Sequence, residues 1–290
     1  MGTGMTGVDR NLVVRVATAV VLLPLVLWLL WLGGLPFALL VSAAAAAAAW
    51  ELNELPREGP QPGRGAAPLD RLRGAEIASI AAAFLLPLTE GLDVHGFTAR
   101  AILTALVMVS LVDALLFEPD LPRAPQRVGL AVLGAAYPGL LLGTVVRLRQ
   151  LPDGVAWLVL ALAVTWLNDT GAYFAGRVYG QRKLYPRISP SKTWEGAAGG
   201  LLASIGGALA VKSLGWLPQL PWWGSVVVGA GAGVLGPLGD LSESMLKRAY
   251  GAKDSSRLLP GHGGLLDRID ALLFTGPFVL LCARVLPYLR

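Results

Sequence analysis

Long apolar stretches alternate with short polar breaks along almost the whole chain. They lie near residues 12–32, 35–50, 75–89, 98–117, 127–146, 155–176, 195–214, 222–246 and 266–287. A helix of about 20 mainly apolar residues crosses the hydrocarbon core of a bilayer, and only the second and third stretches are short for this task. The pattern therefore predicts an all-α, polytopic integral membrane protein with about nine transmembrane helices.

The composition agrees with a membrane location. Of the 290 residues, 54% are hydrophobic and only 15% are charged, whereas a soluble domain carries about 25% charged residues. An ordinary water-soluble globule and a disordered chain are both excluded. Cys282 is the only cysteine, so an internal disulfide and a cysteine-based zinc cluster are excluded as well.

Basic residues indicate how the predicted helices are oriented. If the N-terminus is cytoplasmic, most of the 24 Lys and Arg residues fall in cytoplasmic segments, as the positive-inside rule requires. The net charge of +5 is then a property of these loops, and no nucleic-acid partner is expected. The sequence predicts a multi-pass membrane protein, with the Pro- and Gly-rich segment 56–74 as a cytoplasmic loop.

Ionisable residues inside apolar stretches are costly unless they are paired or hydrated, and they therefore mark function. Here they are concentrated in the second half of the chain, and no change of composition marks a second domain. We expect residues 1–290 to form a single membrane domain, in which residues 1–150 are an N-terminal helical scaffold and residues 151–290 are the catalytic half.

Helical spacing groups these ionisable residues on common faces. Asp267 and Asp270 are three residues apart, Asp240 and Ser244 are four apart, and Lys247 is seven residues from Asp240. Each set lines one side of its helix, so three carboxylates from two helices can converge. Carboxylate oxygens are ligands that suit Mg²⁺ or Mn²⁺, and a cation would offset their mutual repulsion.

Two other interpretations of these acids stay open at this point. They can form structural ion pairs with Lys247, Arg248 and Arg268 at the membrane edge, or they can line a proton or ion pathway, as in a secondary transporter.

A glycine-rich turn precedes the last apolar stretch and contains His262, Gly263 and Gly264. Glycines before a helix N-terminus let backbone N–H groups approach an anion such as phosphate. Cations lie in the same part of the sequence, namely Lys192, Lys247, Arg248, Lys253 and Arg268. Metal-binding acids beside phosphate-binding cations are typical of phosphoryl or nucleotidyl transfer, whereas a transport pore needs no such mixture.

The run from Ser244 to Asp270 resembles the motif of the phosphatidate cytidylyltransferases, also called CDP-diacylglycerol synthases, and all fixed positions of that pattern are filled. Elements upstream agree, namely Asn168-Asp169, Tyr173, Gly176-Arg177, Ser189-Pro190, Glu195-Gly196 and Gly239-Asp240. Family members often have Lys or Asn where Ser191 stands. The resemblance covers roughly residues 165–275, and no functional residue is carried over from the first five helices.

The resemblance implies that CTP and phosphatidate react to CDP-diacylglycerol and pyrophosphate, for phospholipid synthesis, with Mg²⁺ required. It also implies paired metals, one of them K⁺, and a homodimer in the lipid bilayer of the cell inner membrane. The metal-binding acids would be Asp240, Asp267 and Asp270, and the further catalytic residues Lys247, Arg248 and Lys253. The substrate-binding residues would be Asp169, Ser189, Lys192, Ser244, His262, Gly263, Gly264 and Arg268.

Two consequences of this assignment concern access and related reactions. CTP arrives from the cytoplasm and phosphatidate from the lipid leaflet, so the active site should face the cytoplasm.

Related CTP-dependent membrane enzymes remain the nearest alternatives: a polyprenol or phytol kinase, or an ether-lipid cytidylyltransferase. His262 would shape the site or shuttle a proton, and it is not assigned as the base.

Overall fold

The computed structural model describes residues 7–58, 74–92, 97–256, 258–261 and 263–286. Within these residues, every predicted apolar stretch corresponds to one helix. The helices are α1 (Gly7–Leu32), α2 (Gly34–Glu58), α3 (Gly74–Gly91), α4 (Phe97–Phe117), α5 (Ala124–Gln150), α6 (Gly154–Tyr179), α7 (Trp194–Ser213), α8 (Trp222–Ala249) and α9 (Leu266–Val285), with a 3-10 turn, η1 (Leu121–Arg123), before α5. Most of the predicted loop 56–74 lies outside the described residues, and its first part continues α2.

Six of the described helices are long and apolar enough to cross a membrane: α2, α4, α5 together with η1, α6, α7 and α8. The predicted class, a helical protein with several membrane-spanning segments, is therefore confirmed. In α1 the apolar segment Val20–Leu32 is shorter, and α9 begins with charged residues at Asp267, Arg268 and Asp270. The count of nine transmembrane helices stays a prediction.

A small β-hairpin between α6 and α7 was not predicted, because the sequence was interpreted as purely helical. Strands β1 (Lys183–Tyr185) and β2 (Ser189–Thr193) pair antiparallel, with Lys183 opposite Thr193 and Tyr185 opposite Ser189. Thr193 then starts α7, because its Oγ1 accepts a hydrogen bond from the N–H of Gly196 at 3.1 Å, as an N-cap side chain does. The hairpin fixes the position of Lys192 relative to the helices.

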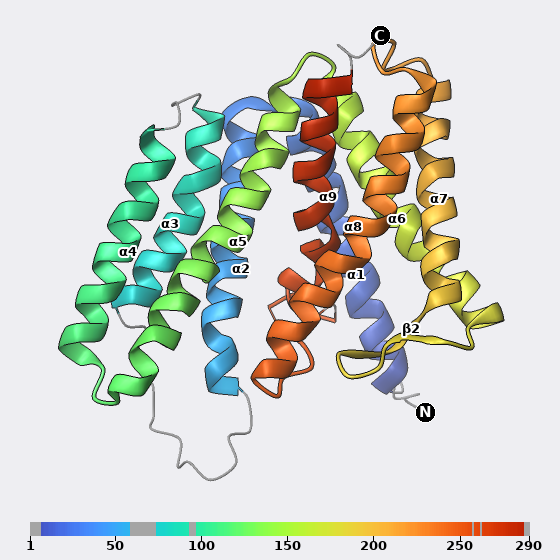
Figure 1. The fold of residues 1–290 in the computed structure, drawn as a ribbon. Coiled ribbons are helices and arrows are strands. Elements are labelled where there is room, and N and C mark those ends of the chain that lie inside the picture. Colours follow the sequence, from blue (N-terminus) through green and yellow to red (C-terminus); the bar gives the residue numbers. More distant parts are fainter. Residues whose placement is uncertain (1–6, 59–73, 93–96, 257, 262, 287–290) are drawn as a thin grey trace, which may run out of the picture.

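Consecutive helices run in opposite directions, as Figure 1 shows. The η1 connection, the β1–β2 hairpin and the α8–α9 connection consequently gather at one end of the bundle, where α1 also begins. This end carries most of the polar residues that the sequence singles out.

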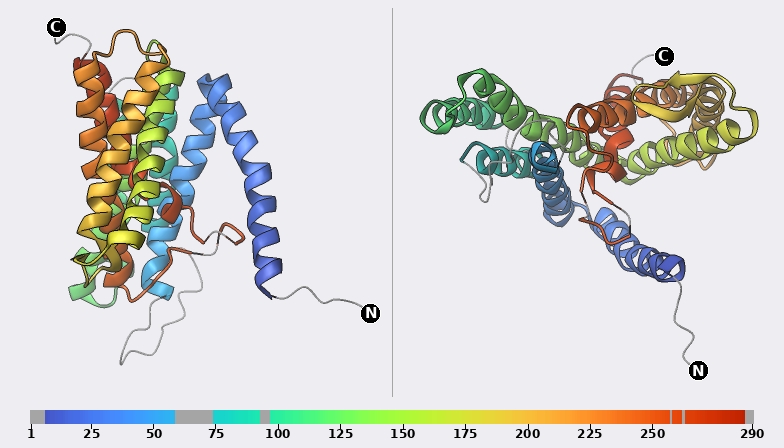
Figure 2. Two further views of the ribbon diagram at one scale, coloured as in Figure 1. Left: turned by 90° about the vertical axis from the view of Figure 1, so that its right-hand side faces the viewer. Right: turned by 90° about the horizontal axis from the view of Figure 1, so that it is seen from below.

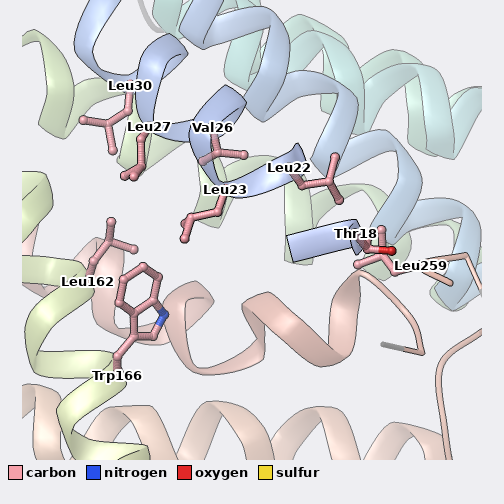
Figure 3. A pocket seen from close by; sticks show the side chains of 9 residues that line it. All are labelled: Thr18, Leu22, Leu23, Val26, Leu27, Leu30, Leu162, Trp166 and Leu259. Carbon is pink, nitrogen blue, oxygen red and sulfur yellow. The ribbon is translucent and has the colours of Figure 1, made fainter. Parts of the chain in front are cut away.

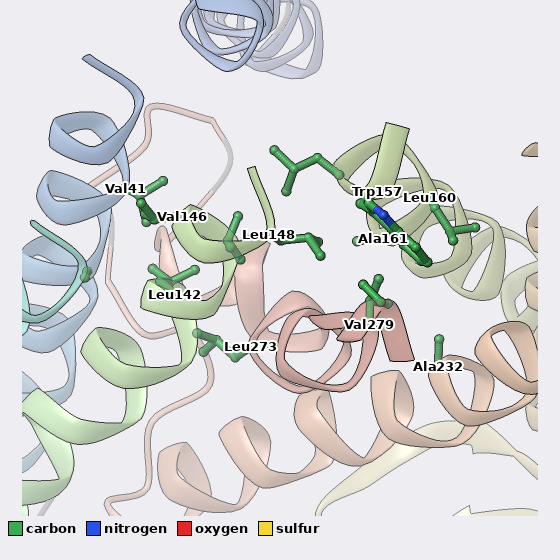
Figure 4. Close-up of a cluster of buried hydrophobic side chains, with 14 of the residues drawn as sticks. Val41, Leu142, Val146, Leu148, Trp157, Leu160, Ala161, Ala232, Leu273 and Val279 are labelled. Atoms are coloured by element: carbon green, nitrogen blue, oxygen red, sulfur yellow. The ribbon is translucent and has the colours of Figure 1, made fainter. Parts of the chain in front are cut away.

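Helix α9 lies in the middle of the bundle and packs against α5, α6 and α8. Figure 4 shows the apolar side chains at this junction, including Leu142 and Val146 of α5, Trp157 of α6 and Val279 of α9. Trp157 is 2% exposed and Val279 is fully buried. Because lipid is as apolar as these side chains, close packing rather than the hydrophobic effect stabilises such contacts within a membrane.

Helix α1 leans away from the other helices and meets α2 at a sharp turn (Figure 2). Gly33 makes this turn with φ +69°, and a Cβ here would lie 2.6 Å from the guanidinium of Arg149. Arg149 in turn donates to the carbonyl oxygen of Leu30 at 2.8 Å. Toward the other end of α1, Thr18 donates to the carbonyl oxygen of Pro260 at 3.3 Å, so the α8–α9 connection touches α1.

Candidate active site

Polar residues from three helices and the hairpin meet in one group at the loop end of the bundle. We call Asp169, Lys192, Asp240, Ser244 and Asp270 the Asp240 group. Lys192 Nζ lies 2.6 Å from Asp240 Oδ2, and Ser244 Oγ lies 3.3 Å from Asp240 Oδ1. Asp270 interacts electrostatically with Asp240, Asp169 and Lys192. The group therefore combines three carboxylates with one ammonium.

A glycine allows α8 and α9 to approach each other at this group. Gly239 precedes Asp240, and a Cβ at Gly239 would lie only 2.6 Å from the backbone oxygen of Asp270. Real Cβ atoms do not come so close to backbone atoms. The Gly239-Asp240 pair noted in the sequence thus has a physical role, because the glycine lets the two aspartates lie on adjoining helix faces.

A second group lies deeper, and we call Glu51, Glu243, Lys247, Ser255, Ser256 and Asp267 the Asp267 group. Lys247 pairs with both Glu243, at 2.6 Å, and Asp267. The side chains of Glu243, Lys247 and Asp267 are only 1%, 10% and 10% exposed. Asp267 Oδ2 also accepts from the Ser255 N–H at 3.1 Å and lies 3.0 Å from the Ser255 hydroxyl.

Residues that were predicted to form one site are divided between these two groups. Ser244 lies beside Asp240, as the four-residue spacing predicted. Lys247 was expected on the Asp240 side of α8, but it pairs with Glu243, one turn back on the same helix, and with Asp267. Within the described part of the chain, which lacks His262, no three Asp, Glu, His or Cys side chains are arranged so that they could hold a metal ion.

The amides at the start of α9 do not face an open anion site, as the glycine-rich turn suggested. The Gly264 N–H donates to Asp267 at 3.1 Å, and those of Leu265 and Leu266 donate to Glu51 at 2.8 and 2.7 Å. Gly263, at φ +85°, exchanges backbone hydrogen bonds with Leu259. The helix N-terminus does attract anions, but the anions here are the protein's own carboxylates.

The remaining predicted residues lie around these groups. Arg248 Nε donates to the carbonyl oxygen of Ile188 at 3.3 Å and so connects α8 to the hairpin that carries Ser189. Lys253 and Arg268 are exposed on the α8–α9 connection and the first turn of α9. His262 lies outside the described residues.

The most enclosed acid of the site, Glu51 of α2, was not among the predicted residues. Its side chain is fully buried, but the predicted apolar stretch ended at residue 50, so this acid was not recognised as lying inside a helix. The sequence did contain a signal for it, because an ionisable residue within an apolar helix is a candidate functional residue. Tyr137 of α5 was missed too, and it interacts electrostatically with Asp270, Glu243 and Asp240.

An apolar groove of about 260 Å³ separates α1 from α6 close to these groups (Figure 3). Leu162 and Trp166 of α6 face Leu23 and Leu27 of α1 across it, and Leu259 of the α8–α9 connection closes one end. Trp166 lies three residues before Asp169, which places the two on neighbouring parts of one helix face. The groove therefore lies along α6 one turn before Asp169 of the Asp240 group.

Fold and site together define a multi-span helical membrane protein with a charged, carboxylate-rich site at one end of its bundle and an apolar groove beside it. The model of the cytidylyltransferase family matches residues 13–286. The chain belongs to this family.

Two relatives with a stated activity match almost the whole chain, and a third matches about half of it. The phosphatidate cytidylyltransferase of Brucella suis biovar 1 is 38% identical over 276 residues, which are 95% of this chain and 94% of that protein. The phosphatidate cytidylyltransferase of Bacillus subtilis is 34% identical over 267 residues, 91% of this chain and 95% of that protein. That of Staphylococcus haemolyticus is 42% identical over 149 residues, 51% of this chain and 56% of that protein.

Proposed function

We propose that the protein transfers the cytidylyl group of CTP to phosphatidate, giving CDP-diacylglycerol and pyrophosphate. Family membership over residues 13–286 supports the reaction class, and the named relatives support the substrates. The observation that carries the proposal in this chain is the Asp240 group, where Asp240 pairs with Lys192 at 2.6 Å and the carboxylates of Asp169 and Asp270 interact electrostatically with both.

The reaction needs cations that neutralise the substrates' negative charges more than it needs a general acid or base. A phosphate oxygen of phosphatidate attacks the α-phosphorus of CTP, a new P–O bond forms, and the bond from the α-phosphorus to the bridging oxygen of pyrophosphate breaks. The attacking phosphate is already an anion near neutral pH, so no strong base is required. The difficulty is the repulsion between two highly charged anions, which cations must offset while they align the reactants.

Three cations lie where they can meet the phosphates. Lys192 is held at the Asp240 group by the hairpin, Arg248 lies at the end of α8, and Lys253 is exposed on the α8–α9 connection. A bound nucleotide that draws Lys192 toward its phosphates would release Asp240 Oδ2 from the ion pair. We assign Lys192, Arg248 and Lys253 to phosphate binding. Lys247 instead neutralises the buried acids Glu243 and Asp267.

The carboxylates fit Mg²⁺ by charge and by ligand type. Mg²⁺ at phosphoryl-transfer sites is commonly bound through one or two carboxylates together with substrate phosphates, so a pair of acids is sufficient. Asp240 and Asp270 would hold it, with Asp169 in support, and the ion would stabilise the charge that develops on the phosphates. Asp267 fits this role less well, because its oxygens are bonded to Lys247, Ser255 and Gly264. The second metal and its identity as K⁺ stay predictions.

The lipid substrate would lie partly in the groove between α1 and α6. An acyl chain along Leu162 and Trp166 would place its headgroup toward Asp169, on the next turn of α6. The lining residues offer almost only carbon to such a chain, which suits a hydrocarbon and no polar ligand.

We also propose that the N-terminus and the site face the cytoplasm, that the host membrane is the inner membrane, and that all nine helices cross it. The gathering of the η1 connection, the hairpin and the α8–α9 connection at one end supports this orientation, since these connections carry many of the cations and cations favour the cytoplasmic side. The scaffold role of residues 1–150 and the homodimer belong to the same proposal.

Labelled nucleotide separates the reaction from its nearest alternatives. Purified protein in nanodiscs, with Mg²⁺, receives CTP labelled at either the α- or the γ-phosphate, and phosphatidate, a polyprenol or an ether-lipid phosphate in parallel. We expect label from the α-phosphate in a phosphatidate product, with release of pyrophosphate. Transfer of the γ-label to lipid would identify a kinase instead, and preference for the ether lipid would reassign the substrate.

Two aspartate variants provide a matched comparison within that assay. Asp240→Asn should abolish turnover, because it removes a charge from the proposed metal site. Asp153→Asn changes the same side-chain type in the α5–α6 turn, at the far end of the bundle, where φ is +57°. Asn tolerates this conformation, so this variant should keep its activity. Equal activity of the two variants would remove Asp240 from the mechanism.

Orientation can be tested with single introduced thiols, because Cys282 is buried and is the only native cysteine. Ser191→Cys lies on the hairpin and Ser213→Cys lies at the opposite end of α7, and both positions are exposed. An impermeant maleimide added to intact spheroplasts should label position 213 and spare position 191. The reverse pattern would invert the proposed topology.

A further inference from the structure

The most buried charged side chain at the site comes from the half of the chain to which the sequence assigned no function. Glu51 of α2 is fully buried, and within the described residues its carboxylate accepts four hydrogen bonds, all from residues more than 200 positions away. Ser256 Oγ donates to Oε1 at 2.6 Å and Ser255 Oγ donates to Oε2 at 3.1 Å. The N–H groups of Leu265 and Leu266 donate at 2.8 and 2.7 Å.

This carboxylate replaces a missing helix cap. The first N–H groups of a helix have no partner within the helix, and a Ser, Thr, Asp or Asn at the N-cap usually binds one of them. The N-cap of α9 is Leu265, which provides no such side chain. Glu51 binds two of these N–H groups, and its negative charge lies at the positive end of the helix dipole.

The same carboxylate also holds the connection that precedes α9. Ser255 lies between two acids, with its hydroxyl 3.1 Å from Glu51 and 3.0 Å from Asp267. Ser255 and Ser256 are both buried, and they follow Lys253 by two and three residues. Glu51 and Asp267 therefore fix both ends of the segment that runs from Lys253 to the first turn of α9.

Helix α9 carries Asp270 one turn after this cap. A shift at the start of α9 would move Asp270 relative to Asp240, which lies on a different helix. A displacement of about 1 Å within a reacting site can reduce the rate about 100-fold. The distance between Asp240 and Asp270 is thus sensitive to what Glu51 binds.

We infer that Glu51 is a positioning residue of the active site, through which α2 caps α9 and orders the Lys253–Leu265 connection. Its carboxylate touches no reacting atom, and it acts through Asp270 and Lys253. The kinetic part of this inference rests on the proposed cytidylyl transfer, whereas the capping itself does not.

The test compares two buried polar residues of the same helix. Glu51→Gln keeps the size of the side chain but replaces one acceptor oxygen with an NH₂ group, so at least one of the four donors loses its acceptor. Asn53→Ala removes buried hydrogen bonds from the same helix, to Ser79 and Ala49, without touching α9. Glu51→Asp serves as the conservative variant, because it retains the charge.

Hydrogen–deuterium exchange in nanodiscs measures the capping directly. In Glu51→Gln we expect at least one of the amides of Leu265 and Leu266, the one that then faces the NH₂ group, to exchange about 10- to 100-fold faster, as for loss of a hydrogen bond to a charged group. We expect Asn53→Ala to leave these amides unchanged and Glu51→Asp to lie between. Unchanged exchange in Glu51→Gln would overturn the capping. Equally fast exchange in Asn53→Ala would also overturn it, because the effect would then follow from any loss of buried hydrogen bonds in α2.

Steady-state kinetics with CTP and phosphatidate measure the positioning. Glu51→Gln should lower kcat about 10- to 100-fold while KM for CTP changes much less, by about threefold, because Asp270 loses its alignment whereas Lys192 and Arg248, two of the three proposed phosphate-binding cations, lie outside the connection that Glu51 holds. Parent-like kcat together with accelerated exchange would show that the cap is structural only and would overturn the positioning role. An inactive parent protein would contradict the proposed function instead, while the exchange measurement would still decide the capping.

Discussion

Replacement of Lys247 by methionine tests whether this lysine neutralises a buried pair of acids. Its ammonium pairs with Glu243 and Asp267, and all three side chains are at least nine-tenths buried. Lys247→Met keeps the apolar stem and leaves two carboxylates facing each other without their cation. Removal of one partner from a buried ion pair costs about 3–5 kcal/mol, which at about 2–4 °C per kcal/mol lowers the unfolding temperature by about 10 °C.

The assay is thermal unfolding of the purified protein in one detergent, followed by tryptophan fluorescence. Lys253→Met is the matched control, because Lys253 is exposed on the nearby connection, and it should change stability by less than about 0.5 kcal/mol. The double variant with Glu243→Gln should recover about half of the loss, since one of the two unpaired charges is then gone. Parent-like unfolding of Lys247→Met would refute the buried-pair reasoning and return Lys247 to the predicted phosphate-binding set.

Two further predictions concern the packing around the site. Gly239→Ala should cost about 1–3 kcal/mol through overpacking and should lower activity, because its Cβ would collide with α9. Gly206→Ala, in α7 with nothing within 4 Å of the new Cβ, should be neutral or stabilising in the same unfolding and turnover assays, and equal losses would contradict the close approach. Leu162→Trp should fill the groove and raise KM for long-chain phosphatidate but not for CTP. Leu202→Trp, at a position 70% exposed on α7, should leave both KM values unchanged, and unaltered lipid kinetics in Leu162→Trp would place the acyl chain elsewhere.

Local properties of the sequence predicted most of the helical fold. The stretch predicted at 98–117 is α4, Phe97–Phe117, because length and apolar content are visible in any window of the chain. The end of α2 was wrong by several residues for a physical reason. The stretch was ended at residue 50, before the charge of Glu51, but that charge is bound by distant partners and the helix continues to Glu58.

The site was predictable to the extent that its contacts are local. Asp240 and Ser244 are one turn apart, and the spacing correctly paired them. The contact of Lys192 with Asp240 depends on a hairpin that no helical periodicity predicts. The contact of Glu51 with Ser255 joins residues 204 positions apart, and a single sequence contains no signal for such a partner.

The separation of the two acid groups predicts that two aspartates of one helix respond differently to Mg²⁺. Asp270 interacts electrostatically with Asp240 and Asp169, so Asp270→Asn should remove one of the proposed metal ligands. The oxygens of Asp267 are bonded to Lys247, Ser255 and Gly264, so Asp267→Asn should disturb the connection before α9 while the metal ligands stay in place.

Turnover measured across a range of Mg²⁺ concentrations distinguishes these two losses. Asp270→Asn should raise the Mg²⁺ concentration for half-maximal activity at least about 10-fold, whereas Asp267→Asn should lower kcat with a change of less than about threefold in that concentration. An equal rise of that Mg²⁺ concentration in both variants would restore the sequence-based prediction of three metal-binding acids. Both carboxylates would then have to bind the same ion. If only Asp270→Asn raises that concentration, Asp267 has the same role as Glu51. Both residues then hold the start of α9 in the position in which Asp270 can bind the metal.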